Sequence, residues 1–132
     1  MTPDQVQRWL DAYLAAWKSY DAAHIAALFS EDAEYRYHPA DEPVRGRDEI
    51  VGAWLNPTGT ASGRDEPGTY EGSYRPFVVD GSRAVAIGTS TYWWDADRTR
   101  LRDVFYNCWL LEFDAAGRCR SFTEYWMQDR EA

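Results

Sequence analysis

The sequence is poor in the residues that bind metals or form disulfides. Its 132 residues include 2 Cys and 2 His, and Cys108, Cys119, His24 and His38 show no metal-ligand spacing. The cysteines fall on neighbouring predicted strands, where the short turn between them would place Cys119 opposite a residue near Glu112 and not opposite Cys108. We therefore expect reduced thiols and no metal site.

Other absences exclude further classes of protein. Basic residues are outnumbered, 14 against 22 acidic, and the net charge of −8 makes a nucleic acid an unexpected partner. No glycine-rich phosphate loop is present, and we expect no cofactor. No apolar run reaches the length of a membrane span and the N-terminus has no secretory pattern, so we expect a cytoplasmic protein without membrane contacts.

Aromatic side chains are abundant. The chain contains 7 Trp, 9 Tyr and 5 Phe, which make up 16% of its residues, and such rings fill a core or line a cavity. The length is that of one ordinary domain, so we predict a single domain over residues 1–132.

The beginning of the chain predicts an amphipathic helix. Thr2, Pro3 and Gln5 have the spacing of a capping box with proline at the first helical position. Apolar residues then recur at intervals of three and four, as in a helix with one buried face: Val6, Trp9, Leu10, Tyr13, Leu14 and Trp17.

Shorter elements are predicted next. Asp21 caps a second helix that we expect to end near Ser30, and a short strand follows over residues 33–38. A third helix is predicted over residues 47–55. Residues 56–68 are rich in Gly, Pro, Thr and Ser and predict a loop long enough to act as a lid.

The remainder predicts an antiparallel meander of four strands, over residues 70–79, 84–94, 103–113 and 119–128, separated by turn residues. Helices followed by a meander are typical of an α+β fold with the helices packed on one face of the sheet.

The last two predicted strands carry polar residues within apolar rows. With a period of two, the rows are Phe105, Asn107, Trp109 and Leu111, and Phe122, Glu124 and Trp126. An acid and an amide among large rings are hard to explain as core filler, whereas small-molecule pockets are commonly lined in this way. The alternative is the opposite strand parity, with Glu124 on a solvated face. A two-residue turn would place Asn107 across from Glu124, and a three-residue loop with a glycine bulge would shift this register by one.

The opposite row of these strands is also apolar. Tyr106, Cys108 and Leu110, with Tyr92 or Trp94, would form a second apolar surface if helices cover only one side. We therefore predict a homodimer that associates through the sheet.

Two further residues are candidates for a site. His38 precedes a proline, which holds it extended at the end of a strand, and imidazole titrates near neutrality. Its alternative role is that of a surface residue. Tyr13 lies on the apolar stripe of the first helix beside Trp17, so its alternative role is packing.

Three motifs carry a resemblance to a known family: the segment Phe29 to Ala33, the helix start Gly46 to Ile50 and the hairpin turn Phe113 to Arg118. Together with the order of elements, they resemble the nuclear transport factor 2-like superfamily over nearly the whole chain, in its SnoaL-like and ketosteroid isomerase-like branch. The resemblance implies a cone-shaped α+β fold in which three N-terminal helices and a curved, mainly antiparallel sheet enclose a deep apolar pocket. It also implies a homodimer.

Ketosteroid isomerases give the closest local resemblance. The stretch Asp32 to Pro39 resembles their segment ending in Asp-Pro, whose aspartate shuttles a proton next to a carbonyl. His38 takes that position if one residue is inserted, and Tyr37 takes it without the insertion. Tyr13 matches their tyrosine that binds the developing oxyanion.

The same resemblance also shows departures. Trp54 replaces a pocket tyrosine, whereas Trp126 matches a tryptophan that lines the pocket. Trp109 stands where the isomerases carry a second oxyanion donor, a carboxylic acid kept protonated by apolar surroundings. Glu124 falls where they have a small apolar residue, so steroid isomerisation is not the activity we expect.

We predict a SnoaL-like pocket protein, and as an enzyme it would be a cofactor-independent isomerase, cyclase or dehydratase that uses proton transfer on an apolar carbonyl or polycyclic compound. The predicted catalytic residues are His38, Glu124 and Tyr13. The predicted ligand contacts are Trp17, Trp54, Phe105, Asn107, Trp109, Phe122 and Trp126. The alternative is a non-catalytic binder of an apolar small molecule or peptide.

Overall fold

The computed structural model describes residues 1–55 and 66–129. The predicted lid over residues 56–68 lies largely outside the described residues. In chain order, the elements are α1 Pro3–Ser19, α2 Ala22–Ala26, β1 Phe29–Arg36, β2 Val44–Arg45, α3 Arg47–Leu55, β3 Tyr70–Asp80, β4 Arg83–Trp93, β5 Leu101–Phe113 and β6 Cys119–Gln128.

The predicted capping box of α1 is confirmed. The Thr2 hydroxyl accepts a hydrogen bond from the Gln5 backbone N–H, and the Gln5 side chain accepts one from the Thr2 N–H. These two bonds satisfy N–H groups that have no partner within the helix. The buried face of α1 includes Trp9 and Tyr13 from the predicted stripe, so local sequence fixes both the start of the helix and its orientation.

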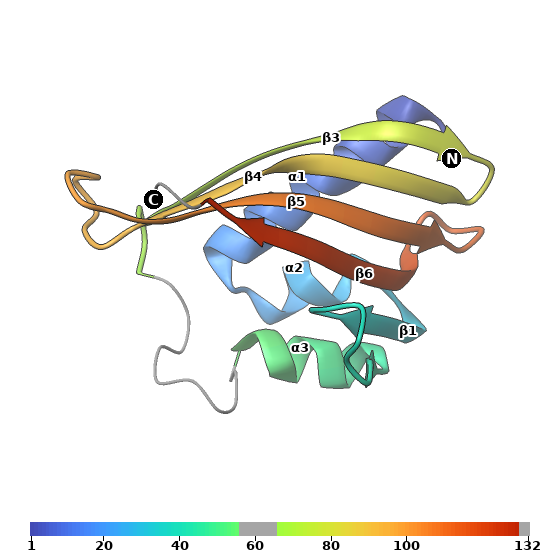
Figure 1. Cartoon of the computed structure of the whole chain (residues 1–132). Helices are drawn as coiled ribbons and strands as arrows, with labels where there is room; N and C mark the ends of the chain where they lie inside the picture. Colours follow the sequence, from blue (N-terminus) through green and yellow to red (C-terminus); the bar gives the residue numbers. More distant parts are fainter. Residues whose placement is uncertain (56–65, 130–132) are drawn as a thin grey trace.

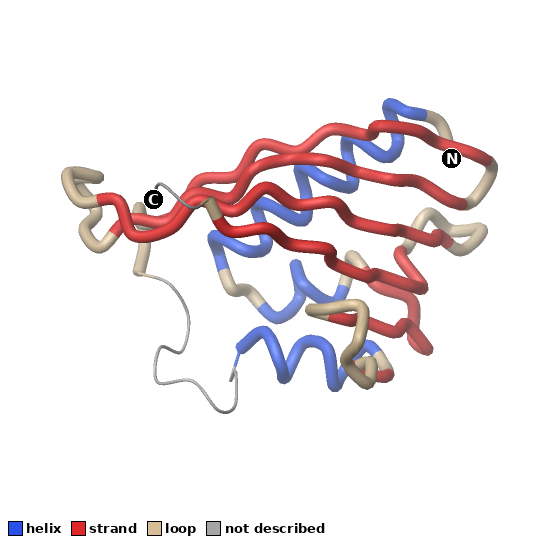
Figure 2. The backbone as a smooth tube through the Cα atoms, viewed as in Figure 1, coloured by secondary structure: helices blue, strands red, loops and turns tan. Residues whose placement is uncertain are grey.

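Six strands form one sheet in the order β2-β1-β6-β5-β4-β3. The predicted meander is confirmed, because β3 to β6 pair with antiparallel neighbours, whereas β1 joins β6 in parallel. The three helices lie on one face, and the long strands sweep over them (Figures 1 and 2). The fold is therefore α+β with a mostly antiparallel sheet.

The second helix and the first strand differ from the prediction. Helix α2 ends at Ala26 and β1 begins at Phe29, whereas we expected the helix to reach Ser30. The reason is a non-local contact: the Cys119 N–H donates to the Leu28 carbonyl, and Phe29 pairs with Cys119 in the sheet. Pairing with β6 thus extends residues that have local helical character.

Strand parity agrees with the prediction. Asn107, Trp109 and Phe122 are buried on the helix side, while Tyr106 and Tyr125 are about half exposed on the other face. This alternation follows from the period of two along a strand. It leaves the outer face of the sheet rich in exposed apolar side chains.

The register between β5 and β6 differs from the predicted one. Glu124 lies opposite Trp109 and Asn107 lies opposite Trp126, because the connecting turn is longer than two residues and the register shifts between Glu112 and Phe113. Cys119 pairs with Phe113, which lies next to Glu112 as predicted, and both cysteines are free thiols.

None of the helices in the described ranges is long and apolar enough to cross a membrane.

Candidate functional site

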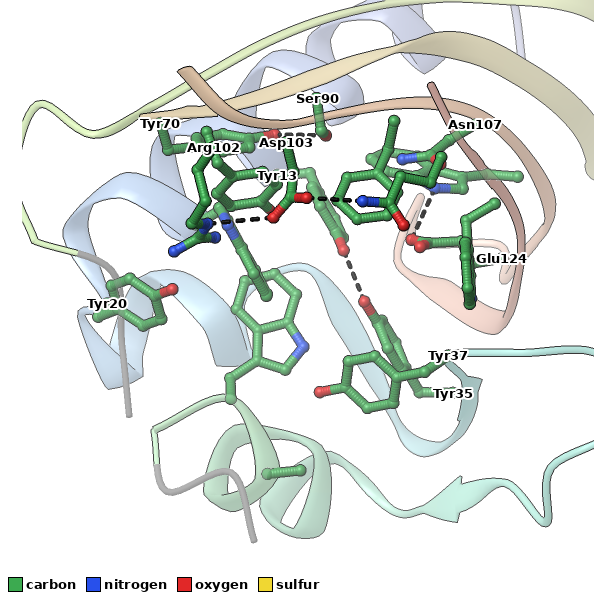
Figure 3. A pocket seen from close by; sticks show the side chains of 18 residues that line it. Tyr13, Tyr20, Tyr35, Tyr37, Tyr70, Ser90, Arg102, Asp103, Asn107 and Glu124 are labelled. Carbon is green, nitrogen blue, oxygen red and sulfur yellow. Dashed lines mark hydrogen bonds and ion pairs between the residues drawn. The ribbon is translucent and has the colours of Figure 1, made fainter. Parts of the chain in front are cut away.

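A pocket of about 490 Å³ opens between the helices and the inner face of the sheet (Figure 3). Its volume lies within the range that is usual for small-molecule sites. Most of its walls are aromatic, and polar groups are set among the rings. The lining residues are Tyr13, Trp17, Tyr20, Tyr35, Tyr37, Ala53, Trp54, Tyr70, Ser90, Tyr92, Arg102, Asp103, Phe105, Asn107, Trp109, Glu124, Trp126 and Gln128.

The structure brings most of the predicted site residues together. Those that line the pocket are Tyr13, Trp17, Trp54, Phe105, Asn107, Trp109, Glu124 and Trp126. They come from α1, α3, β5 and β6. Residues far apart in the sequence thus meet at one cavity, as the alternating rows and the helical stripe predicted.

Two predicted residues lie outside this lining. Phe122 is fully buried in the core, where its ring lies parallel to those of Tyr13 and Tyr35. His38 is exposed; its Nδ1 accepts a hydrogen bond from the Ala40 N–H, and its ring centre lies 6.4 Å from that of Trp126 at the pocket rim. The chain has already left β1 at this point, so His38 does not follow the inward alternation of the strand.

Glu124 is one of two carboxylic acids that line the pocket, the other being Asp103. Its Oε2 accepts a hydrogen bond of 3.0 Å from the Trp109 indole N–H across the β5–β6 pair. Burial raises the pKa of Glu124 to about 7, and the Trp109 hydrogen bond opposes this rise because it stabilises the charged form. At neutral pH the side chain is therefore present both with and without its proton.

A pair of tyrosines joins helix and sheet beside this acid. The hydroxyls of Tyr13 on α1 and Tyr35 on β1 lie 2.6 Å apart, and Figure 3 shows Glu124 pointing toward them. Burial raises the pKa of both tyrosines well above the ordinary value, and the charge of Glu124 raises it further. Both hydroxyls stay protonated, and since one proton serves the bond within the pair, the other can be donated to a ligand.

Tyr37 also lines the pocket, whereas its neighbour His38 does not. Burial, and then the charge of Glu124, raises the pKa of Tyr37 to about 12. In the resemblance to ketosteroid isomerases, the position of the catalytic base falls on Tyr37 when no residue is inserted. A neutral tyrosine is a hydrogen-bond donor and not a base at physiological pH.

A second group of hydrogen bonds fixes the sheet wall. The Asn107 amide Nδ2 donates to the Tyr74 hydroxyl at 2.7 Å, and the Ser90 hydroxyl bonds both Tyr74, at 2.6 Å, and Tyr70, at 3.0 Å. Within the described residues, the buried Oδ1 of Asn107 has no partner. These bonds join side chains of β3, β4 and β5 in one network.

Charged residues lie at the open end. The Asp103 carboxylate accepts hydrogen bonds from the Gln128 amide at 2.7 Å and from the Arg102 Nε at 3.2 Å. The Arg102 guanidinium lies 4.8 Å from the centre of the Tyr92 ring and 5.5 Å from that of Trp94. No cluster of three His, Cys, Asp or Glu side chains in the described part of the chain is arranged to hold a metal ion.

Sequence reasoning missed several lining residues. Tyr35 and Tyr37 alternate with charged Glu34 and Arg36, so the period of two could have assigned both tyrosines to the inner face. Ser90, by contrast, reaches the pocket through the register of β4 with its neighbours, and nothing local signals this.

A curved, mostly antiparallel sheet packed on three helices, with a pocket between them, defines the nuclear transport factor 2-like class of proteins. Over residues 10–122 the sequence matches the SnoaL-like domain family. The chain belongs to this family.

Solved structures of other proteins share this fold. A protein from Burkholderia xenovorans LB400, described as NTF-2 like and of unknown function, aligns with a TM-score of 0.67 at 18% identity, covering 98% of this chain and 88% of that chain. A putative ketosteroid isomerase from Kribbella flavida DSM 17836 aligns with a TM-score of 0.67 at 19% identity and coverages of 98% and 83%.

An LEH-like epoxide hydrolase from M. tuberculosis aligns with a TM-score of 0.65 at 18% identity, covering 95% of this chain and 84% of that chain. These identities establish the fold and leave the reaction open. No curated protein matches the sequence.

Proposed function

We propose that the pocket binds a small, largely apolar carbonyl compound and that Glu124 transfers a proton at the carbon next to the carbonyl. The observation that carries the proposal is a carboxyl group with a pKa of about 7 in an aromatic pocket that also contains buried tyrosine hydroxyls. General acid-base catalysis is most effective when the pKa of the group lies near the operating pH.

The proposed reaction uses Glu124 and the Tyr13–Tyr35 pair. Ionised Glu124 removes a proton from the carbon, and the electrons of the broken C–H bond form an enolate whose charge lies on the former carbonyl oxygen. The tyrosine pair donates its remaining O–H to that oxygen, which stabilises the charge as it develops. Protonated Glu124 then returns the proton to the same carbon or to a conjugated one, and the second outcome is an isomerisation.

Proton exchange at the ligand tests this proposal. A panel of aromatic and bicyclic ketones is incubated with the protein in D2O, and loss of the signal from protons next to the carbonyl is followed by 1H NMR. We expect exchange faster than in buffer, abolished by Glu124→Gln with little change in ketone affinity. Because His38 lies outside the lining, His38→Asn should retain most of the exchange.

The second candidate is a non-catalytic binder. It is favoured by the hydrogen bond that already occupies one oxygen of Glu124 and by the position of His38 outside the lining. This candidate requires that ketones bind without any exchange above the buffer rate. That result would refute the catalytic proposal and retain the pocket as a binding site.

The proposed partner in solution is a second copy of the chain, docked on the outer face of the sheet. Tyr106, Leu110, Tyr125 and Met127 are 42–69% exposed on this face. The three helices cover the other face (Figure 1), and a soluble monomer rarely leaves a continuous apolar surface of this kind in water. A two-fold arrangement would bury the same residues on both copies.

A further inference from the structure

The pocket acid is held by a tryptophan that lies directly across the β5–β6 pair. The Trp109 indole N–H donates to Oε2 of Glu124 at 3.0 Å, and among the described residues it is the hydrogen-bond partner of this carboxylate. Trp109 is almost completely buried, so water does not compete for its N–H. One oxygen of Glu124 is therefore fixed, and the other, Oε1, is left for the pocket.

The indole itself is held in place by packing on its faces and edges. The Tyr74 ring stacks on it with a centroid distance of 4.0 Å and an interplanar angle of 14°. Tyr13 and Phe122 contact it at centroid distances of 4.6 Å and 5.1 Å. Turning the indole away from Glu124 would break these contacts.

Tyr74 is fixed in turn by the sheet wall. Its hydroxyl is bonded to Asn107 and Ser90, and its ring lies over Gly88, where an added Cβ would collide with the Tyr74 ring and with the Ser73 carbonyl oxygen. Glycine on β4 thus makes room for the ring that supports the indole. Interdigitated groups of this kind keep their geometry because the core has few voids.

We propose that Trp109 is the positioning residue of this site: its indole N–H fixes one oxygen of Glu124 and thereby aims the other at the ligand. The role of the aimed oxygen rests on the proposed function. The hydrogen bond itself can be tested without any substrate.

The hydrogen bond has an electrostatic consequence. It stabilises the ionised form of Glu124, so its removal raises the pKa of Glu124 further. The charge of Glu124 raises the pKa of five tyrosines. They are Tyr13 on α1, Tyr35 on β1, Tyr37 just after β1, and Tyr70 and Tyr74 on β3. The pKa of each is raised, so none of these tyrosines titrates between pH 5 and 9. Repeating the titration in His38→Asn excludes a contribution from the pocket rim, where the His38 ring lies 6.4 Å from that of Trp126.

The native protein provides the first measurement. The indole N–H signals of the 7 Trp are followed by 1H–15N NMR from pH 5 to 9. We expect the Trp109 signal to shift with a midpoint at about 7, because its acceptor gains charge there. The Trp9 N–H donates to the Leu28 carbonyl at 3.0 Å and serves as the internal control, since that acceptor does not titrate.

Two replacements of Trp109 provide the second measurement. Trp109→Phe removes the N–H together with part of the ring, whereas replacing Trp109 with 3-benzothienylalanine removes the N–H and keeps the ring size. In both, we expect the pKa of Glu124, read from its labelled side-chain carboxyl, to rise by about one pH unit. Trp9→Phe loses a buried indole N–H of the same kind and should leave that pKa unchanged.

Ketone exchange provides a third readout. In both Trp109 variants, the pH profile of exchange should move upward with the pKa of Glu124. With 3-benzothienylalanine at position 109, which keeps the ring that lines the pocket, the rate at the high-pH plateau should fall by about tenfold, with KM changed by less than about twofold, because the oxygen of Glu124 is less well aimed.

An unchanged pKa of Glu124 in both Trp109 variants overturns the inference, as does an equal rise in Trp9→Phe. If the native protein exchanges no ketone proton, the proposed catalytic function fails, and the two NMR titrations still decide whether Trp109 holds Glu124.

Discussion

Glutamine in place of Glu124 should stabilise the folded protein at neutral and alkaline pH and have little effect at pH 4. Burial raises the pKa of Glu124 from its ordinary 4.5 to about 7, which means that folding disfavours the ionised form. Glutamine has nearly the same shape and keeps an oxygen for the Trp109 N–H, but it carries no charge. The substitution therefore removes the cost of ionisation and keeps the packing.

The magnitude follows from the two pKa values. At roughly 1.4 kcal/mol per pH unit, the difference between 4.5 and about 7 corresponds to about 3 kcal/mol. The sign follows from proton binding: below pH 4.5 both folded and unfolded chains hold the proton, and no cost arises. Between pH 4.5 and about 7 the unfolded chain has lost its proton while the folded chain retains it, so native stability falls as the pH rises. Above that range the cost is constant.

Urea unfolding from pH 4 to 8, followed by tryptophan fluorescence, measures this effect. The free energy of unfolding of Glu124→Gln should exceed that of the native protein by about 3 kcal/mol at pH 8, equivalent to about 10 °C in Tm, and the difference should vanish near pH 4. Protein concentration is kept constant, because self-association also changes apparent stability. Glu31→Gln, on an exposed position of β1, is the matched control and should follow the native curve.

Parallel stability curves for the native protein and Glu124→Gln between pH 5 and 8 would refute this reasoning. A variant that is less stable than the native protein at pH 8 would refute it as well, because the ionised carboxylate would then be a net source of stability.

Further predictions concern packing, hydrogen bonding and association. Gly88→Ala should destabilise the fold by about 3 kcal/mol through overpacking between strands, whereas Gly52→Ala, which has open space around it in α3, should stabilise by up to about 1 kcal/mol in the same urea assay. Tyr13→Phe and Tyr35→Phe each leave a buried hydroxyl without its partner and should each cost about 1–2 kcal/mol, while the double variant should cost less than the two together. Leu110→Glu should convert the proposed dimer to a monomer in sedimentation velocity, and a native protein that is already monomeric at micromolar concentration would refute the dimer.

Much of the fold was predictable because its signals are local. The cap at Thr2, the aromatic stripe of α1 and the alternation along β5 and β6 depend on residues only a few positions apart. The same alternation assigned Glu124 and Asn107 to the inner face.

The start of β1 could not be predicted in this way. Residues 27–30 follow a capped helix. They join the sheet because Leu28 and Phe29 pair with Cys119, which lies about ninety positions later in the sequence. That parallel pairing also carries Tyr35 to the pocket and sets it against Tyr13.

Local patterns in the sequence were enough to predict an α+β domain with an acid in an aromatic row, because helical and strand periods are properties of neighbouring residues. The surroundings of that acid depend on contacts between residues that are distant in the sequence. The longer turn and the shift in register between Glu112 and Phe113 together place Trp109, and not Asn107, across from Glu124. Cross-strand partners depend on the turn and on the packing of every strand at once, so the hydrogen bond and burial that set the pKa of Glu124 near 7 arise only in the folded chain.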